Sequence, residues 1–253
     1  MSLCASNPLR PAMSECCSSF GWGTPVSPAR HALLRVDTQA YRLALEERPD
    51  LASETLLFDW AALSRPLIAR RRGPCDAAGL TPAGIALPPS HGKKRIALQL
   101  APGAILAVEP PPLLRACAHA APAAWLPAIE AIVELGARAG VEIRVFGALA
   151  WSALTGLAYL SASSDLDLLF AMTARTDARA LLEGLARIER SALMRLDGEL
   201  IRQDLGAGAN WRELSAGARD VLAKSIAGVA LRPASAFLFD DNSHRQADWR
   251  AAS

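Results

Sequence analysis

Three consecutive prolines, Pro110–Pro112, constrain the fold of this chain more than any other feature of its sequence. Each proline ring fixes φ at about −65° and removes a backbone N–H donor, so neither a helix nor a central strand continues through them. We therefore predict a linker here, between a small N-terminal domain over residues 29–112 and a main domain over residues 118–236. Residues 1–28 are predicted to form a disordered extension, and residues 237–253 a tail.

The composition fits a globular protein and narrows its partners. Hydrophobic residues make up 51% of the 253 residues and charged residues 21%, which is ample material for packed cores. A net charge of +2 gives no support to a general nucleic-acid or membrane-surface role. The chain has no apolar run of about 18 residues, and its five cysteines are odd in number and lack CxxC spacing. The sequence therefore predicts a cytoplasmic protein with reduced thiols and with neither nucleic-acid nor membrane partners.

Hydrophobic periodicity predicts an α+β fold in both parts of the chain. The elements expected in the N-terminal domain are strands at 31–36, 66–69 and 95–100 and a helix within 49–63. The elements expected in the main domain are helices at 126–136, 151–157 and 177–191 and strands at 141–146, 165–170 and 210–214. Asp197-Gly198 is a hairpin turn signal between two further short strands. The main domain is thus expected to be a mixed sheet flanked by helices.

Asp165 and Asp167 are the strongest candidates for chemistry in the chain. Residues two apart on a strand point to the same face, so both carboxylates project together while Leu166 and Leu168 point into a core. Two close carboxylates repel unless a cation or a shared proton neutralises them. Mg²⁺ suits such a pair because it takes one or two carboxylates together with substrate phosphates and water. The alternative is two solvated acids at a strand end, since Asp-x-Asp is short and common by chance.

Gly147 lies upstream, between the strand at 141–146 and the following helix. A glycine at such a turn lets backbone N–H groups approach a phosphate closely. The nucleotidyltransferase fold has the same order of parts: a Gly-Ser or Gly-Gly turn, an acid-x-acid strand and a third acid further on. Here Ala148 follows the glycine, so a hydroxyl that usually touches phosphate is absent, and the interval to Asp165 is longer than in that superfamily.

Residues 145–160, continued by Ser164-Asp165-Leu166-Asp167-Leu168-Leu169, resemble phosphoribosyl-dephospho-CoA transferase, the holo-acyl-carrier-protein synthase of malonate decarboxylase. That family has a Gly-Ser-x-x-Trp turn, a Leu-Thr-Gly with a nearby Tyr-Leu, and Ser-Asp-x-Asp-Leu-Leu. The corresponding blocks here are Gly-Ala-Leu-Ala-Trp, Leu-Thr-Gly, Tyr-Leu and Ser-Asp-Leu-Asp-Leu-Leu. Weaker likeness extends over about residues 30–235. Ala148 departs from the family's serine.

The resemblance implies a nucleotidyltransferase-like fold and a defined reaction. Phosphoribosyl-dephospho-CoA would pass from triphosphoribosyl-dephospho-CoA to a serine of the acyl-carrier subunit of malonate decarboxylase, and pyrophosphate would leave. Asp165 and Asp167 would be the catalytic residues and would hold Mg²⁺, which polarises the phosphorus and stabilises the departing pyrophosphate. A third acid would assist them; Glu199 and Glu213 are the candidates, with Glu199 as the expected metal ligand, while Asp197 is assigned to the hairpin turn.

Further residues are candidates for holding the donor. These predicted binding residues are Gly147, Ala148, Lys224, Arg71 and Arg72. The basic clusters Arg70–Arg72 and Lys93–Arg95 are solvated faces, or they contact donor phosphates or an acidic carrier subunit. Trp151 and Trp211 are interpreted as core residues rather than as platforms for a base.

Two other functions fit the same features. A nucleotidyltransferase could modify another protein or a small molecule with an ordinary nucleoside triphosphate as donor. A catalytically silent carrier-binding relative is suggested by Ala148, although two intact, mutually repelling carboxylates argue against it.

Overall fold

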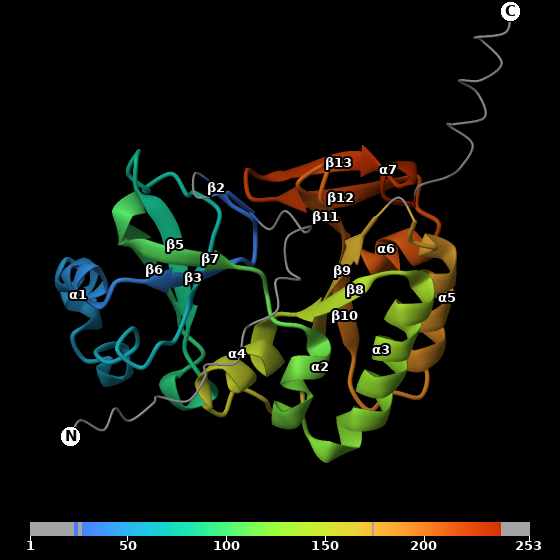
Figure 1. Cartoon of the computed structure of the whole chain (residues 1–253), viewed down its shortest axis with the longest axis horizontal. Helices are drawn as coiled ribbons and strands as arrows, with labels where there is room; N and C mark the ends of the chain where they lie inside the picture. The colour runs from blue at the N-terminus through green and yellow to red at the C-terminus, as the bar shows by residue number, and fades with distance from the viewer. Residues whose placement is uncertain (1–22, 25–26, 174, 239–253) are drawn as a thin grey trace, which may run out of the picture.

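Two β-sheets organise the chain in the computed structural model, which describes residues 23–24, 27–173 and 175–238 (Figure 1). The N-terminal sheet has the order β6-β5-β4-β3-β7 and is antiparallel throughout. The C-terminal sheet has the order β13-β12-β11-β10-β9-β8 and is mixed, because β9 and β10 run parallel. The expected α+β class with a mixed sheet is confirmed. The expectations for residues 1–28 and 237–253 fall almost entirely outside the described residues.

The N-terminal sheet confirms the three strands expected there. Its strands and the adjoining short elements are β1 (Gly23–Thr24), β2 (Ser27–Pro28), β3 (Leu33–Val36), β4 (Leu67–Ala69), β5 (Thr81–Ala86), β6 (Arg95–Leu100) and β7 (Ile105–Glu109). One helix, α1 (Thr38–Glu46), follows β3 and begins where the Asp37 side chain accepts a hydrogen bond from the Ala40 N–H at 2.9 Å.

The helix expected within 49–63 is wrong. The segment instead forms successive 3₁₀ turns, including Pro49–Leu51 and Thr55–Leu57. The residues that it buries are spaced by three: Leu51, Glu54, Leu57 and Trp60. A spacing of three matches the 3.0 residues per turn of a 3₁₀-helix better than the 3.6 of an α-helix.

The C-terminal part confirms three expected helices and two strands, with shifted bounds. Its helices are α2 (Leu114–Cys117), α3 (Leu126–Ala139), α4 (Gly147–Thr155), α5 (Ala178–Glu189), α6 (Trp211–Ser215) and α7 (Ser235–Leu238). Its strands are β8 (Glu142–Val145), β9 (Leu166–Met172), β10 (Leu196–Arg202), β11 (Ala207–Asn210), β12 (Asp220–Ser225) and β13 (Val229–Pro233). Helix α4 begins four residues earlier than expected, at Gly147 itself. Among the described helices, none combines the length and apolar character needed to cross a bilayer.

The hairpin expected at Asp197-Gly198 is wrong, because β10 runs straight through both residues. Strand β10 pairs in parallel with β9, and helix α5 makes the crossover between them. A Cβ on Gly198 would lie 2.9 Å from the Leu168 carbonyl oxygen and 3.0 Å from the Phe170 ring. The glycine therefore serves close packing within the sheet and not a turn.

The strand expected at 210–214 is also wrong. Asn210 ends β11 and caps α6, its side chain accepting a hydrogen bond from the Arg212 N–H at 2.9 Å. An asparagine in this position satisfies a free N–H of the first helical turn and so favours a helix start.

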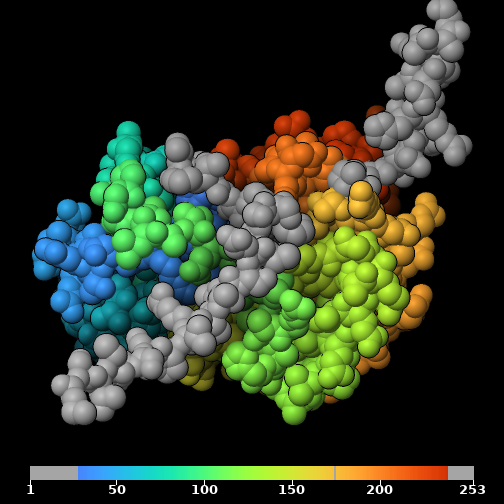
Figure 2. Space-filling model, in the orientation of Figure 1, coloured from blue at the N-terminus to red at the C-terminus, as the bar shows by residue number. Residues whose placement is uncertain are grey.

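Each sheet has its own hydrophobic core, but residues from beyond the three prolines help to fill the core of the N-terminal sheet. Trp151 of α4 and Tyr159 of the following loop pack into the core of the N-terminal sheet. The Trp151 ring lies 6.0 Å from Trp60 and 6.1 Å from Tyr159, centroid to centroid. The Tyr159 hydroxyl donates a hydrogen bond to the Ala86 carbonyl at 2.8 Å. Figure 2 shows the two parts packed side by side.

A substitution at Gly136 tests how closely the buried face of α3 packs against the sheet. A Cβ there would lie 2.6 Å from Ile143 Cδ1 and 2.9 Å from the Val141 carbonyl oxygen. We expect Gly136→Ala to lower the free energy of unfolding by about 1–3 kcal/mol, because overpacking outweighs the roughly 1 kcal/mol gain in helix propensity. Gly103→Ala is the control, since nothing lies within 4 Å of its added Cβ. Urea unfolding measures both, and an unchanged midpoint for Gly136→Ala would contradict the tight α3–β8 contact.

Candidate active site

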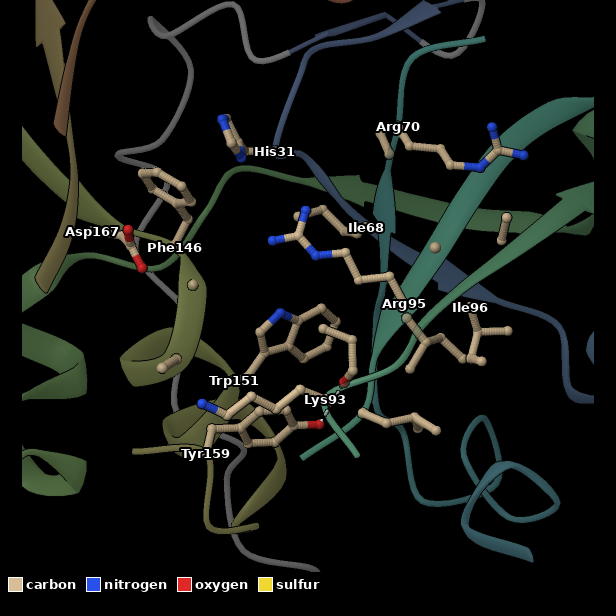
Figure 3. A pocket seen from close by; sticks show the side chains of 18 of the residues that line it. His31, Ile68, Arg70, Lys93, Arg95, Ile96, Phe146, Trp151, Tyr159 and Asp167 are labelled. Atoms are coloured by element: carbon tan, nitrogen blue, oxygen red, sulfur yellow. Dashed lines mark hydrogen bonds between the residues drawn. The ribbon is translucent and has the colours of Figure 1, made fainter. Parts of the chain in front are cut away.

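Asp165 immediately precedes β9 and Asp167 is the second residue of that strand. Asp167 lines a cavity between the two sheets (Figure 3). Asp167 is half-buried, and its carboxylate accepts a hydrogen bond from the Ala148 N–H in the first turn of α4. Its backbone carbonyl accepts another from the Phe146 N–H at 3.0 Å. The β9 carboxylate therefore sits against the N-terminus of α4, where the helix dipole favours negative charge.

Asp197 is the acid that sequence reasoning assigned to the wrong role. It pairs with Asp167 in the parallel register of β9 and β10, so the two side chains lie next to each other on one face. Its Oδ1 accepts a hydrogen bond from the Asn210 Nδ2 at 2.9 Å. Arg195 bridges the group, with guanidinium nitrogens 3.5 Å from Asp165 and 3.8 Å from Asp197. Three carboxylates, those of Asp165, Asp167 and Asp197, thus lie together with Arg195 at the N-terminal ends of β9 and β10.

The crowding of these acids changes the acidity of Asp167. Burial raises the pKa of Asp167 from 3.8 to about 7, and the charges of Asp197 and Asp165 act in the same direction. Arg195 and the Ala148 N–H lower that pKa, but not enough to cancel the rise. The protein alone leaves negative charge here under-compensated, as expected of a site that accepts a cation. Within the described residues, no three His, Cys, Asp or Glu side chains are arranged to hold a metal by themselves.

Gly147 lets α4 approach Asp167. Its φ is +65°, which favours glycine, and a Cβ there would lie 1.8 Å from Asp167 Oδ2. No side chain fits between the helix start and the carboxylate. Ala148 follows on α4, and both residues line the cavity.

Glu199, the expected third metal ligand, is engaged elsewhere. Both of its oxygens accept hydrogen bonds from Arg30, at 2.5 and 2.7 Å, and one also accepts from Lys224 at 3.2 Å. Burial would raise the pKa of Glu199, but Arg30, together with His31 and Lys224, outweighs it and holds that pKa below its ordinary value. Glu199 therefore ties the segment before β3 to the C-terminal sheet, and Asp197 is the third carboxylate that lies close to Asp167. Lys224 is paired with Glu199 and does not line the cavity.

Two other candidates are placed away from the acids. Glu213 lies on α6 and accepts a hydrogen bond from the Leu222 N–H of β12 at 2.9 Å. Trp211 is buried, and its indole N–H donates to the Leu196 carbonyl at 3.2 Å, so it is a core residue. Trp151 is also buried, but one side of it lines the cavity.

The cavity measures about 550 Å³ and joins the acids to a basic wall. Arg71 lines it, as expected of a donor-binding residue, whereas Arg72 donates to the carbonyls of Ala77 and Leu80 and lies outside it. From the second basic cluster, Lys93 and Arg95 line the cavity. The cavity thus has the Asp167 carboxylate at one side and cations at the other.

His31 is a cavity residue that sequence reasoning missed. Its ring lies 4.3 Å from Phe146, centroid to centroid, and its Nε2 is buried with no hydrogen-bond partner among the described residues. Burial and the charge of Arg30 lower the pKa of His31 to about 3, so the imidazole is neutral at physiological pH. No motif surrounds it, and only the fold brings it beside α4.

Comparison with known proteins identifies the family of the chain. Residues 29–111 match the family described as the phosphoribosyl-dephospho-CoA transferase MdcG N-terminal domain, and residues 113–235 match the corresponding C-terminal domain. A phosphoribosyl-dephospho-CoA transferase of Bradyrhizobium diazoefficiens is 44% identical over 204 residues, which cover 81% of this chain and 89% of that protein. Another, from Xanthomonas euvesicatoria pv. vesicatoria, is 38% identical over 209 residues, which cover 82% and 95%. No solved structure matches.

These matches, together with the acid-bearing strand, define the chain as a transferase. It belongs to the phosphoribosyl-dephospho-CoA transferase family.

Gly147→Ala tests the contact between α4 and Asp167. We expect it to reduce transferase activity by about 100-fold or more, because the added Cβ displaces the Asp167 carboxylate. Gly156→Ala is the matched control: Gly156 also has a positive φ, +71°, but nothing lies within 4 Å of its added Cβ. Steady-state kinetics and thermal unfolding of both variants separate the two effects. Equal losses of activity would show that backbone strain alone is responsible.

The raised pKa of Asp167 predicts the sign of a pH effect on stability. The folded protein keeps this proton up to about pH 7, whereas the unfolded chain loses it near 3.8. Between these values the folded state binds more protons, so this group's contribution to stability falls as pH rises. In the absence of divalent cations, we expect the Tm of Asp167→Asn minus the Tm of the wild type to increase between about pH 5 and about pH 8. A constant Tm difference would contradict the raised pKa.

Proposed function

We propose that the chain transfers phosphoribosyl-dephospho-CoA from triphosphoribosyl-dephospho-CoA to a serine of the acyl-carrier subunit of malonate decarboxylase, in the cytoplasm, with release of pyrophosphate. The observation that carries the proposal is the Asp167 carboxylate, which accepts a hydrogen bond from the start of α4 and lines a cavity with a basic wall, while Asp165 and Asp197 lie close enough to raise its pKa. The relatives are phosphoribosyl-dephospho-CoA transferases, which supports phosphoribosyl-dephospho-CoA as the transferred group. The triphosphate donor, the malonate decarboxylase serine and the leaving pyrophosphate are the finer parts of the proposal.

The residues present fit Mg²⁺. Asp165 and Asp167 are near enough for one to raise the pKa of the other, and a nearby cation would relieve this repulsion. Two carboxylates suffice for a Mg²⁺ that completes its shell with water and substrate phosphates. Asp165 and Asp167 would hold it, with Asp197 beside them. When bound, the ion would supply charge neutralisation at the reacting phosphate.

The chain's own groups then position the reactants. The acceptor serine oxygen bonds to the phosphorus nearest the ribose, and the bond from that phosphorus to the pyrophosphate oxygen breaks. Asp197, held by Asn210, takes the hydroxyl proton. Such transfer needs alignment and charge compensation more than covalent help from the protein.

The role of the N-terminal sheet follows from the cavity. It closes one side of the site and packs around Trp151 and Tyr159, which also line the cavity. These two rings and the basic wall are therefore fixed relative to Asp167. The acceptor serine must enter from the open side, because a carrier subunit is too large for a cavity of about 550 Å³.

The decisive assay measures pyrophosphate release from triphosphoribosyl-dephospho-CoA in the presence of Mg²⁺ and the apo carrier. We expect turnover by the wild type and a loss of about 100-fold or more in Asp165→Ala and Asp167→Ala, since both remove charge at the reacting phosphate. Asp220→Ala, which removes an exposed acid of β12, is the control. Mg²⁺ should also raise the Tm of the wild type at about pH 8 and not that of Asp165→Ala.

The same assay separates the alternatives. Turnover with ATP in place of the triphosphoribosyl donor would identify a nucleotidyltransferase with an ordinary donor. Binding of the carrier without turnover of either donor would identify a silent relative, the possibility that Ala148 raises. Wild-type rates in Asp165→Ala or Asp167→Ala would remove the acidic site from the mechanism.

A further inference from the structure

The cavity has a cationic wall that comes wholly from the N-terminal sheet and its loops. Five residues carry positive side chains at its lining: Arg30, Arg70, Arg71, Lys93 and Arg95. Two of them are already neutralised. Arg30 pairs with Glu199, and Arg70 pairs with both oxygens of Asp76 at 2.6 and 2.5 Å. Figure 3 shows the Arg70 guanidinium pointing away from Asp167.

The other three cations have no counter-ion within the part of the chain that the structure describes. Arg71, Lys93 and Arg95 form no ion pair with any of the described residues. Lys93 is moreover held at φ +54°, an uncommon backbone conformation for a side-chain-bearing residue. The Arg95 guanidinium extends across the cavity toward Phe146 and Asp167 (Figure 3). Three like charges around one cavity repel, and an anion there removes the repulsion.

We propose that Arg71, Lys93 and Arg95 bind the two terminal phosphates of the donor, the pair that departs as pyrophosphate. The inference rests on the proposed function and assigns each end of the triphosphate to one side of the cavity. The reacting phosphorus lies by the acids of β9 and β10, where the serine oxygen bonds to it. The phosphates beyond it reach the unpaired cations of the opposite wall.

In this arrangement the three cations would stabilise the leaving group during the transfer. As the bond to the leaving oxygen breaks, its electron pair stays on pyrophosphate, and the charge grows beside Arg95 and its two neighbours. Arginine suits this role because its planar fork binds phosphate oxygens in pairs, and lysine adds a point charge. The N-terminal sheet thereby distinguishes a triphosphate from a monophosphate ester.

Inorganic tripolyphosphate tests the inference without any donor turnover. We expect it to bind the wild type by titration calorimetry, and each of Arg71→Ala, Lys93→Ala and Arg95→Ala to weaken binding about tenfold or more. Added salt should weaken wild-type binding more than that of the variants. The control is Arg42→Ala, which removes an exposed arginine of α1 outside the cavity and should bind as the wild type does.

Product inhibition in the transfer assay supplies the second measurement. The inhibition constant of pyrophosphate and the KM for the donor should both rise in the three variants and stay unchanged in Arg42→Ala. If the wild type turns over the donor while the three variants match Arg42→Ala in both constants and in tripolyphosphate binding, the inference is overturned and the proposed function stands. If tripolyphosphate binding depends on the three cations but the donor is not turned over, the phosphate site stands and the proposed donor is wrong.

Discussion

The contact between the Asp167 carboxylate and the first turn of α4 determines the rest of the site. The Ala148 N–H reaches the carboxylate because Gly147 has no side chain, and a Cβ there would lie only 1.8 Å from Oδ2. This contact locks the helix start to β9. Because β10 pairs in parallel with β9, Asp197 is then placed beside Asp167 without any further element. The close approach of the α4 backbone to the Asp167 carboxylate thus positions both the acids and helix α4, which lines the cavity.

The cavity divides its electrostatic character between the two sheets. The C-terminal sheet contributes the Asp167 carboxylate, and the N-terminal sheet contributes Arg71, Lys93 and Arg95, which have no ion-pair partner among the described residues. The partly buried Glu199–Arg30 pair links the sheets next to the cavity. A buried pair of this kind adds little net stability, but breaking it leaves an uncompensated charge, so it fixes the relative position of the two parts.

Local patterns in the sequence predicted much of this structure. The apolar spacing of α3 and the alternation of β6 and β8 were sufficient to find those elements, and the two-residue spacing of Asp165 and Asp167 predicted their common face. The failures were non-local. Asp197-Gly198 carries a turn signal, yet a glycine is needed there because Phe170 of the parallel strand β9 leaves no room for a side chain. Glu199 looked free because its partner Arg30 lies 169 residues away.

The aromatic pair Trp151 and Tyr159 has a consequence for how such a chain can be divided. The family matches on either side of Pro112 suggest two interchangeable modules, but the core of the first sheet is completed by rings from the second part. If the chain were divided at the prolines, the C-terminal fragment would expose these rings to water, and the core of the N-terminal fragment would contain an unfilled cavity. A hybrid assembled from two relatives would therefore need both rings and the residues that surround them from the same parent.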